Sequence, residues 1–399
     1  MSVYSGFEYA PADPIMGMTD AFNQDPASQK VNLGVGVYLD ETGKTPLMAC
    51  VDAVEQDLAA CHRPRGYLPM DGMPTYNEAV QELVFGVNSP ARLSGRVVTM
   101  QALAGTGALR LGAGVLALAS PNATVYLSDP SWENHELLFS RAGFPIKRYR
   151  YYDRPTRSLD VEGMLEDLAQ ADPGSIVVLH ACCHNPTGYD LSEDEWPRVI
   201  DVCRERNLVP FLDMAYQGLS RGIEEDAFAV RAFAESELPF LIANSFSKTF
   251  GLYGERIGAI HFVATDADEA ARVLSQAKLV VRSMYSNPCT QGAAIVSTVL
   301  KTPELRALWE QELGQMRSRI KSMRVDFRAG LEAAGVSQDV SYITSQAGMF
   351  SYSGLSVEQM QQLRSQFHVY GLDSGRLCMA GLNRNNLDYV VDAVAHVMG

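Results

Sequence analysis

The sequence predicts an α/β fold with a smaller α+β lobe built around the C-terminus. Three observations support this prediction. The middle of the chain alternates short β-branched runs with longer helical patterns, several of the runs are apolar throughout, and one long amphipathic pattern precedes the C-terminal segments. Strands that are apolar on both faces are typical of a mostly parallel sheet that helices cover on both sides.

Seven runs are expected to form the strands of the sheet. One of them contains Ile176-Val177-Val178-Leu179, without a polar interruption. The segments between the runs are long enough for helical crossovers, which parallel neighbours require. In chain order the expected strands are residues 97–101, 124–128, 146–149, 175–180, 209–213, 241–245 and 258–264.

One long helix is expected to connect the two lobes. Thr302 suits its N-cap and Pro303 its first turn. Apolar residues then recur in steps of three and four from Leu305 to Leu331, which indicates one buried face. Gly335 is expected to end the helix.

The chain after this helix is predicted to complete the smaller lobe. Residues 340–344 and 349–352 have the composition of short strands. A further helix is expected to begin at Ser356. The smaller lobe therefore mixes strands and helices.

Composition restricts the class of protein. The chain has 399 residues and a hydrophobic fraction of 47%, so we expect a globular protein of one large and one smaller domain. Its formal net charge of −14 makes binding to nucleic acid unexpected. It contains no apolar run of 18 residues and no secretory signal, so no membrane partner is expected. The seven cysteines show no framework spacing, which predicts reduced thiols and a cytoplasmic location.

The most informative chemical motif is NSFSKTFGLYGERIG, from Asn244 to Gly258. Small hydroxyl residues end a predicted strand, and a lysine, a Gly-rich turn and an arginine follow. Serine and arginine bind phosphate oxygens and lysine attacks carbonyl carbons, so the segment suits a ligand that carries both groups. We expect burial and the charge of Arg256 to lower the pKa of Lys248, as a nucleophilic amine requires. A lone lysine would more often be a solvated surface residue.

A second Gly-rich segment, AGTGALR at residues 104–110, follows a predicted strand and opens a helix. Free backbone N–H groups and the helix dipole favour a phosphate at such a position. Arg110 stands where the dinucleotide fingerprint G-x-G-x-x-G has its third glycine, which weakens the alternative of an NAD-dependent enzyme.

Three further segments carry candidate functional residues. Trp132 offers an aromatic plane for stacking, although a lone Trp is more often a core residue. The run HACCHNPTG, residues 180–188, is not read as a zinc site, because no second ligand pair lies at finger spacing. Asp213 ends a predicted strand and Tyr216 follows it, and a buried carboxylate at this place would keep a pyridine nitrogen protonated. An isolated Asp here would more often cap a turn.

Together these segments resemble the class I (fold type I) aminotransferases that use pyridoxal 5′-phosphate (PLP), in the aspartate and aromatic aminotransferase subgroup. The resemblance covers essentially the whole chain. It implies a large PLP-binding domain at residues 48–325 with a seven-stranded, mostly parallel sheet covered by helices. It also implies a smaller α+β domain from both termini, at residues 15–47 and 326–399, and an N-terminal arm at residues 1–14.

The resemblance also assigns roles around the cofactor. It implies that Lys248 holds PLP as a Schiff base and moves the substrate proton, with Asp213, Tyr216 and Trp132 as the other catalytic residues. His135 stands behind Asp213, and the bonds Asp129-Pro130 and Asn185-Pro186 are expected to be cis. The implied cofactor-binding residues are Tyr67, Gly105, Thr106, Gly107, Trp132, Asn185, Asp213, Tyr216, Ser245, Ser247, Lys248 and Arg256.

The implied substrates are small amino acids and 2-oxo acids. Arg376 matches the arginine that binds the α-carboxylate, and Arg282 matches the one that binds a side-chain carboxylate. Arg282 and Tyr67 are expected to act in the partner's site of a homodimer. The other implied substrate-binding residues are Gly36, Trp132 and Asn185.

Local matches favour the bacterial aromatic (tyrosine) branch. The expected reaction moves the amino group of phenylalanine, tyrosine or tryptophan to 2-oxoglutarate by a ping-pong mechanism, with aspartate and glutamate also accepted. The alternative is an aspartate aminotransferase. Another PLP reaction, such as aspartate decarboxylation, and a non-catalytic protein of the same fold remain as further alternatives.

Overall fold

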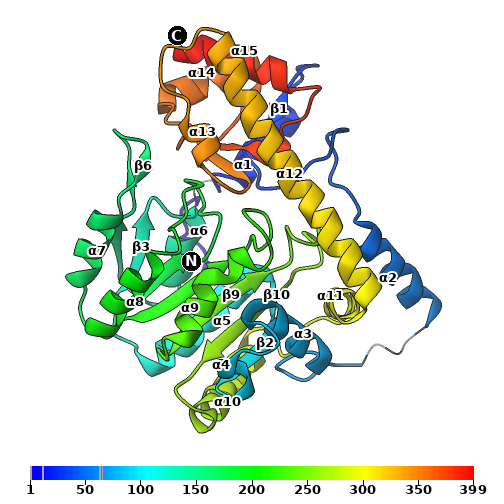
Figure 1. Cartoon of the computed structure of the whole chain (residues 1–399), viewed down its shortest axis with the longest axis vertical. Coiled ribbons are helices and arrows are strands. Elements are labelled where there is room, and N and C mark those ends of the chain that lie inside the picture. The colour runs from blue at the N-terminus through cyan, green and yellow to red at the C-terminus, as the bar shows by residue number, and fades with distance from the viewer. Residues whose placement is uncertain (1, 11–12, 63, 65) are drawn as a thin grey trace.

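A seven-stranded sheet forms the centre of the computed structural model, which describes residues 2–10, 13–62, 64 and 66–399 (Figure 1). All seven predicted strands belong to it. Only β10 runs antiparallel to its neighbours, so the expectation of a mostly parallel sheet is confirmed. In spatial order the strands are β2 (Val97–Leu103), β10 (Ile257–Val263), β9 (Phe240–Ser245), β8 (Val209–Met214), β7 (Ile176–His180), β3 (Val125–Asp129) and β4 (Ile146–Arg150).

Helices cover both faces of the sheet because its central strands are apolar on both sides. In β7, Ile176 and Val178 pack into one core cluster, while Val177 and Leu179 pack into the other. The first face carries α5 (Ala104–Ala119), α6 (Glu133–Ser140) and α10 (Ala267–Met284). The second carries α3 (Pro74–Phe85), α7 (Val161–Ala169), α8 (Trp196–Glu205) and α9 (Phe228–Glu235). Helices α2 (Ala49–Ala60), α4 (Pro90–Leu93) and α11 (Gln291–Lys301) and the short strands β5 (Tyr152–Asp153) and β6 (Ser158–Leu159) complete this part.

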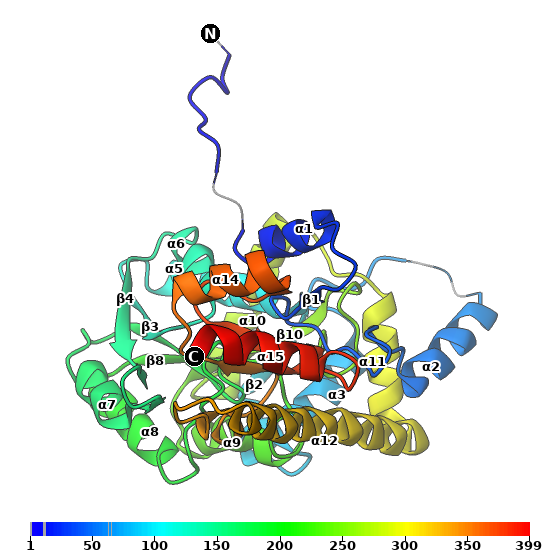
Figure 2. The same cartoon turned by 90° about the horizontal axis from the view of Figure 1, so that it is seen from above.

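The smaller lobe joins segments from both ends of the chain (Figure 2). Strand β1 (Val31–Asn32) pairs with β12 (Val369–Tyr370), and β11 (Phe350–Tyr352) pairs with β13 (Arg376–Cys378). Around them lie α1 (Met16–Gln24), α13 (Tyr342–Ser345), α14 (Val357–Phe367) and α15 (Leu387–Met398). Ser356 makes a capping box with Gln359, so the predicted helix start is confirmed.

Helix α12 (Pro303–Ala333) is the predicted long connector and runs from the large body into the smaller lobe (Figure 1). Its bounds match the prediction, but the Thr302 side chain makes no capping hydrogen bond. The predicted strand at 340–344 is wrong. This segment forms α13 and packs against α12, where the Arg324 guanidinium donates to the Ile343 carbonyl. Among the described residues no strand pairs with it.

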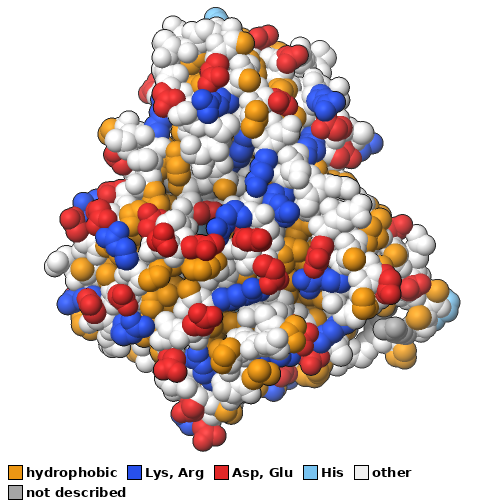
Figure 3. All heavy atoms as spheres, viewed as in Figure 1, with side chains coloured by type: hydrophobic (Ala, Val, Ile, Leu, Met, Phe, Trp, Pro, Cys, Tyr) orange, Lys and Arg blue, Asp and Glu red, His pale blue; other side chains and the backbone are white. Residues whose placement is uncertain are grey.

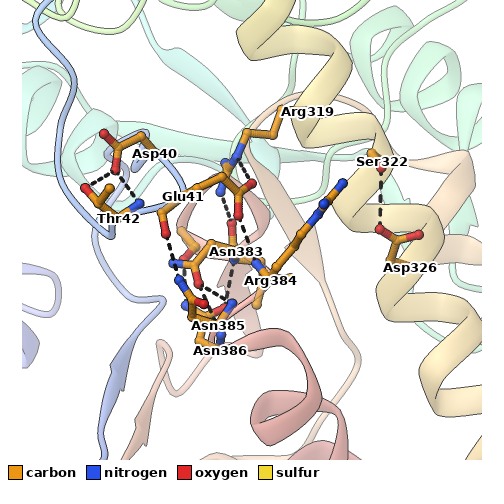
Figure 4. Close-up of polar contacts among 12 residues, drawn as sticks. Asp40, Glu41, Thr42, Arg319, Ser322, Asp326, Asn383, Arg384, Asn385 and Asn386 are labelled. Atoms are coloured by element: carbon orange, nitrogen blue, oxygen red, sulfur yellow. Dashed lines mark hydrogen bonds and ion pairs between the residues drawn. The ribbon is translucent and has the colours of Figure 1, made fainter.

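A polar cluster fastens the N-terminal part of the smaller lobe to its C-terminal part (Figure 4). The Arg319 guanidinium on α12 donates to Glu41 Oε1 at 2.8 Å. The backbone N–H of Arg384 donates to Glu41 Oε2, and the Asn385 amide donates to the Glu41 carbonyl. Hydrogen bonds therefore link residues more than 270 positions apart in the sequence, and Arg319 of the connector helix α12 takes part in them.

The domain limits drawn from the sequence stay predictions. α12 continues without interruption across the expected limit at residue 325. The expected arm at 1–14 includes residues 1, 11 and 12, which lie outside the described residues.

Acidic and basic side chains are interspersed over the face of the molecule that Figure 3 shows. Among the described helices, none is both long enough and apolar enough to cross a membrane.

Candidate active site

A cavity of about 330 Å³ opens where the sheet meets the smaller lobe. It lies at the carboxyl ends of the parallel strands, the usual place for a ligand in such a sheet. The smaller lobe contributes Gly36, Phe350 and Arg376 to its wall. The sequence-predicted residues that line it are Gly36, Gly105, Thr106, Trp132, Asn185, Asp213, Tyr216, Ser245, Ser247, Lys248, Arg256 and Arg376.

Lys248 follows β9 and places its Nζ 5.0 Å from the centre of the Tyr216 ring. Burial lowers the pKa of Lys248 to about 8, and the positive charges of Arg256 and Arg376 act in the same direction. Asp213 opposes this shift without reversing it. The amine is therefore partly neutral near pH 8, as the sequence led us to expect, and Arg376 is a contributor that the sequence did not indicate.

Hydroxyl groups, a helix start and a guanidinium meet at one end of the cavity. Ser245 Oγ donates to Ser247 Oγ at 3.2 Å, and both side chains are buried. Gly105 and Thr106 lie in the first turn of α5, whose N–H groups and dipole favour an anion. Arg256 lines the same cavity and precedes β10.

This end depends on close backbone packing. A Cβ at Gly258 would lie 2.5 Å from the Asn244 carbonyl oxygen and 2.7 Å from the Ala104 carbonyl carbon, so only glycine lets α5 approach the sheet here. Ala104 itself adopts φ +56°, a left-handed conformation that glycine takes more easily. The alanine is thus tolerated at some energetic cost.

A buried carboxylate ends β8. His135 Nε2 lies 3.0 Å from Asp213 Oδ2, and His135 Nδ1 lies 2.9 Å from Ser131 Oγ. Burial opposes charge on Asp213, but the hydrogen bond from His135 and nearby positive charges hold the carboxyl pKa below its usual value. The side chain is therefore an anion that faces the cavity.

Arg376 lines the cavity from the smaller lobe, and its side chain is 1% exposed. It donates to Asn185 Oδ1 at 3.0 Å and to the Gly34 carbonyl at 2.7 Å, and its guanidinium lies 4.3 Å from the centre of the Phe350 ring. Both predicted cis peptide bonds, Asp129-Pro130 and Asn185-Pro186, are present.

Three predicted residues lie outside this cavity. Gly107 is in the first turn of α5, but it is not part of the wall. Tyr67 is 94% exposed, and Arg282 is exposed near the end of α10. The chain alone does not bring Tyr67 and Arg282 to the cavity, which agrees with their expected contribution to a partner's site and does not test it.

Sequence reasoning missed several wall residues. Ile15 and Met16 form apolar wall, and Tyr253 lines the cavity from the turn between Lys248 and Arg256. Phe350 is not among the missed residues, because the resemblance implied that its segment lines the edge of the site. His180 also lines the cavity, and neither of its ring nitrogens has a partner among the described residues. Its position was available from the strands, because His180 pairs with Asp213 where two adjacent parallel strands end.

The two histidines of the HACCHNPTG run have different environments. His184 uses both ring nitrogens, with Ser128 Oγ at 3.0 Å and Thr187 Oγ1 at 2.8 Å, and it stacks on Tyr151. Burial lowers the pKa of His180 to about 3. His184 therefore has no free nitrogen for a metal, and His180 remains neutral beside the cavity.

The donor set fits PLP. A partly neutral amine on Lys248 suits an aldehyde, and the α5 start with its serines and Arg256 suits a phosphate. The Asp213 carboxylate suits a protonated pyridine nitrogen. The half-buried Trp132 offers a plane for a ring.

Comparison with known proteins agrees with this arrangement. Residues 28–394 match the family model described as aminotransferase class I and II. The chain is 54% identical to an aspartate aminotransferase of Pseudomonas aeruginosa, with both chains fully covered. It is 45% identical to the aromatic-amino-acid aminotransferase of Escherichia coli, over 97% of this chain and 98% of that one.

A solved structure shows the same similarity. The aromatic-amino-acid aminotransferase of Burkholderia pseudomallei, covalently bound to pyridoxal phosphate, superposes with a TM-score of 0.98 at 53% identity and full coverage of both chains. The family match and the donor set lead to the same conclusion. The chain belongs to the class I and II aminotransferases and is a PLP-dependent transaminase.

Proposed function

We propose that this transaminase moves the amino group of aromatic amino acids to 2-oxoglutarate and also accepts aspartate and glutamate. The observation that carries the proposal is one cavity that unites Lys248, Asp213 and Arg376. An apolar wall of Ile15, Met16, Val35, Val37, Leu109 and Phe350 supports acceptance of an aromatic ring. Relatives of both names support the double specificity.

The proposed chemistry rests on Lys248. When bound, PLP withdraws electrons from the substrate Cα and so acidifies its hydrogen. Lys248 Nζ accepts that proton, which its lowered pKa permits near neutral pH. Asp213, held by His135, supplies a fixed negative charge that would keep the ring nitrogen of the bound cofactor protonated.

Other wall residues position the ligands. Ser245, Ser247, Arg256 and the start of α5, with Gly105, Thr106 and Gly107, would hold the phosphate. Tyr216 and Asn185 would contact the ring oxygen, and Trp132 would stack on the ring. Arg376 would bind the substrate α-carboxylate as a bidentate fork beside Gly36.

The proposed assembly is a homodimer with shared sites, in the cytoplasm. The Lys278–Asp71 ion pair of 3.1 Å holds α10 against the turn that follows Tyr67, so Tyr67 and Arg282 belong to one region. Leu279 and Met284 on α10 are exposed apolar residues, as an interface requires. None of the seven cysteines, all within the described part of the chain, forms a disulfide, which supports a reducing compartment.

The absorption spectrum of the cofactor-loaded protein tests the substrate class. L-Phenylalanine, L-tyrosine and L-aspartate are added separately, without an oxo acid, and conversion of the cofactor to its aminated form is followed. Conversion at low concentrations of the aromatic amino acids supports the proposal. Conversion by aspartate alone would make the chain an aspartate aminotransferase, the alternative that a role for Arg282 favours.

A subunit-mixing experiment tests the shared site. Lys248→Ala and Arg282→Ala homodimers are each expected to lose aspartate turnover. In a mixed dimer one site would contain Lys248 from one subunit and Arg282 from the other, so activity should return. If Arg282 served its own subunit, no site in the mixture would be complete and aspartate turnover would stay absent.

A further inference from the structure

Arg324 is a buried cation that serves no obvious purpose in the reaction. It lies on α12 and is 3% exposed. It has no ion pair with a carboxylate in the part of the chain that the structure describes. Burial lowers its pKa to about 10. A charge in such a place requires compensation by dipoles.

Backbone carbonyls of one loop supply that compensation. Nη1 donates to the Ile343 carbonyl at 3.0 Å, and Nη2 donates to the carbonyls of Gly348 at 2.9 Å and Ala347 at 3.2 Å. Nη2 also donates to the carbonyl of Phe350. One guanidinium therefore fixes the loop from residue 343 to residue 350.

Phe350 carries this constraint into the active site. Its ring lines the cavity and lies 4.3 Å from the Arg376 guanidinium. It meets Tyr216 edge-on, with ring centres 6.0 Å apart. A Cβ at Gly36 would lie only 2.8 Å from Phe350 Cζ, so the ring also fits closely under the segment that covers the cavity.

The same loop contacts the large body. The Ala347 N–H donates to the Gly188 carbonyl at 2.6 Å. A Cβ at Gly188 would lie 2.8 Å from the Phe350 carbonyl oxygen. The loop is thus fixed between α12 on one side and the Asn185-Pro186 turn on the other.

We propose that Arg324 is a positioning residue for substrate recognition. It fixes Phe350 and, through the Phe350 ring, the orientation in which Arg376 receives the α-carboxylate. Arg324 does not touch the substrate. The inference rests on the proposed function, because it requires that Arg376 binds that carboxylate.

The experiment compares substrates with and without the α-carboxylate on the cofactor-loaded enzyme. The pairs are L-phenylalanine with 2-phenylethylamine, and L-aspartate with β-alanine. Arg324→Lys is the test variant. Arg328→Lys is the matched control, because Arg328 lies one turn further along α12 and bonds Glu332 and the Thr344 side chain instead of the loop carbonyls.

We expect Arg324→Lys to raise KM for both amino acids about tenfold, the scale of a small misplacement of a binding group. Rates with the two amines that lack the α-carboxylate should stay within about twofold of wild type. Arg328→Lys should change neither. Equal losses on both members of a pair, or no loss on either, would overturn the inference.

A second variant, Phe350→Leu, tests the inference if Arg324→Lys does not fold. Phe350→Leu keeps an apolar side chain but removes the ring under Arg376, so it should show the same carboxylate-selective rise in KM. A loss that is equal for the amino acid and the amine would contradict the inference. If the wild-type enzyme turned over neither amino acid, the proposed function would fail and the inference with it.

Discussion

The buried positive charge of Lys248 should lower the free energy of unfolding of the apoprotein. Its pKa falls from 10.5 to about 8 in the folded chain. At about 1.4 kcal/mol per pH unit, the difference corresponds to about 3 kcal/mol. Below pH 8 the amine is protonated in both states, so the folded state carries the full cost of the buried charge.

The sign of the pH dependence follows from proton binding. Between pH 8 and pH 10.5 the unfolded chain holds a proton on Lys248 that the folded chain has lost. The free energy of unfolding should therefore rise with pH in this window as far as Lys248 is concerned. Lys248→Met removes the charge at similar volume. It should stabilise the apoprotein by about 2–3 kcal/mol at pH 7, and the gain should disappear near pH 10.5.

Urea unfolding of the apoproteins, at one protein concentration and from pH 7 to pH 10.5, measures this difference. Taking wild type minus variant cancels the titration of all other groups. Lys321→Met is the control, because Lys321 is exposed on α12 and should give a difference near zero. A Lys248→Met variant that is no more stable than wild type at pH 7, or a gain that does not change with pH, would refute the reasoning.

Two other substitutions give clear expectations. Asp213→Asn removes the anion that His135 holds, and turnover should fall about a hundredfold or more. Urea unfolding of the apoprotein should still show a folded chain, and turnover near wild type would contradict the role of the carboxylate. Ala104→Gly removes about 1–2 kcal/mol of left-handed strain and costs about 0.5–1 kcal/mol of chain entropy, so the free energy of unfolding should rise by up to about 1.5 kcal/mol and the urea midpoint should rise with it. A lower midpoint would show that Ala104 makes contacts worth more than its strain.

The central sheet could be predicted because its strands are buried on both faces. An apolar run such as Ile176-Val177-Val178-Leu179 leaves few alternatives, and all seven predicted strands are in the sheet. The segment at 340–344 has a similar local pattern but forms α13. Arg324, which lies some twenty residues earlier on α12, donates to the Ile343 carbonyl, and the local pattern of the segment does not show this contact.

The candidate site could be predicted where a motif and its position on a strand coincide. Lys248 follows β9, Asn185 follows β7, and Asp213 lies near the end of β8 between them, so their convergence needs only the parallel sheet. Phe350 and Arg376 come from the smaller lobe, and the sequence indicates their approach only through resemblance. Tyr67 and Arg282 remain exposed, and no property of a single chain determines what covers them.

The charge of the cavity is opposite to that of the chain. The net charge of the chain is −14, yet the wall of the cavity carries Lys248, Arg256 and Arg376 against one carboxylate, Asp213. His180 adds no charge because burial lowers its pKa to about 3. Lys248 is partly neutral near pH 8, so Arg256 and Arg376 are the lasting cations against one anion, and Arg376 is buried, where charge interactions are stronger than at the surface. A phosphate at the start of α5 and a carboxylate at Arg376 would supply the negative charge that these two arginines require. Cofactor and substrate would thus be recognised through the same two arginines. Burial lowers the pKa of Lys248 most, and the charges of these arginines lower it further.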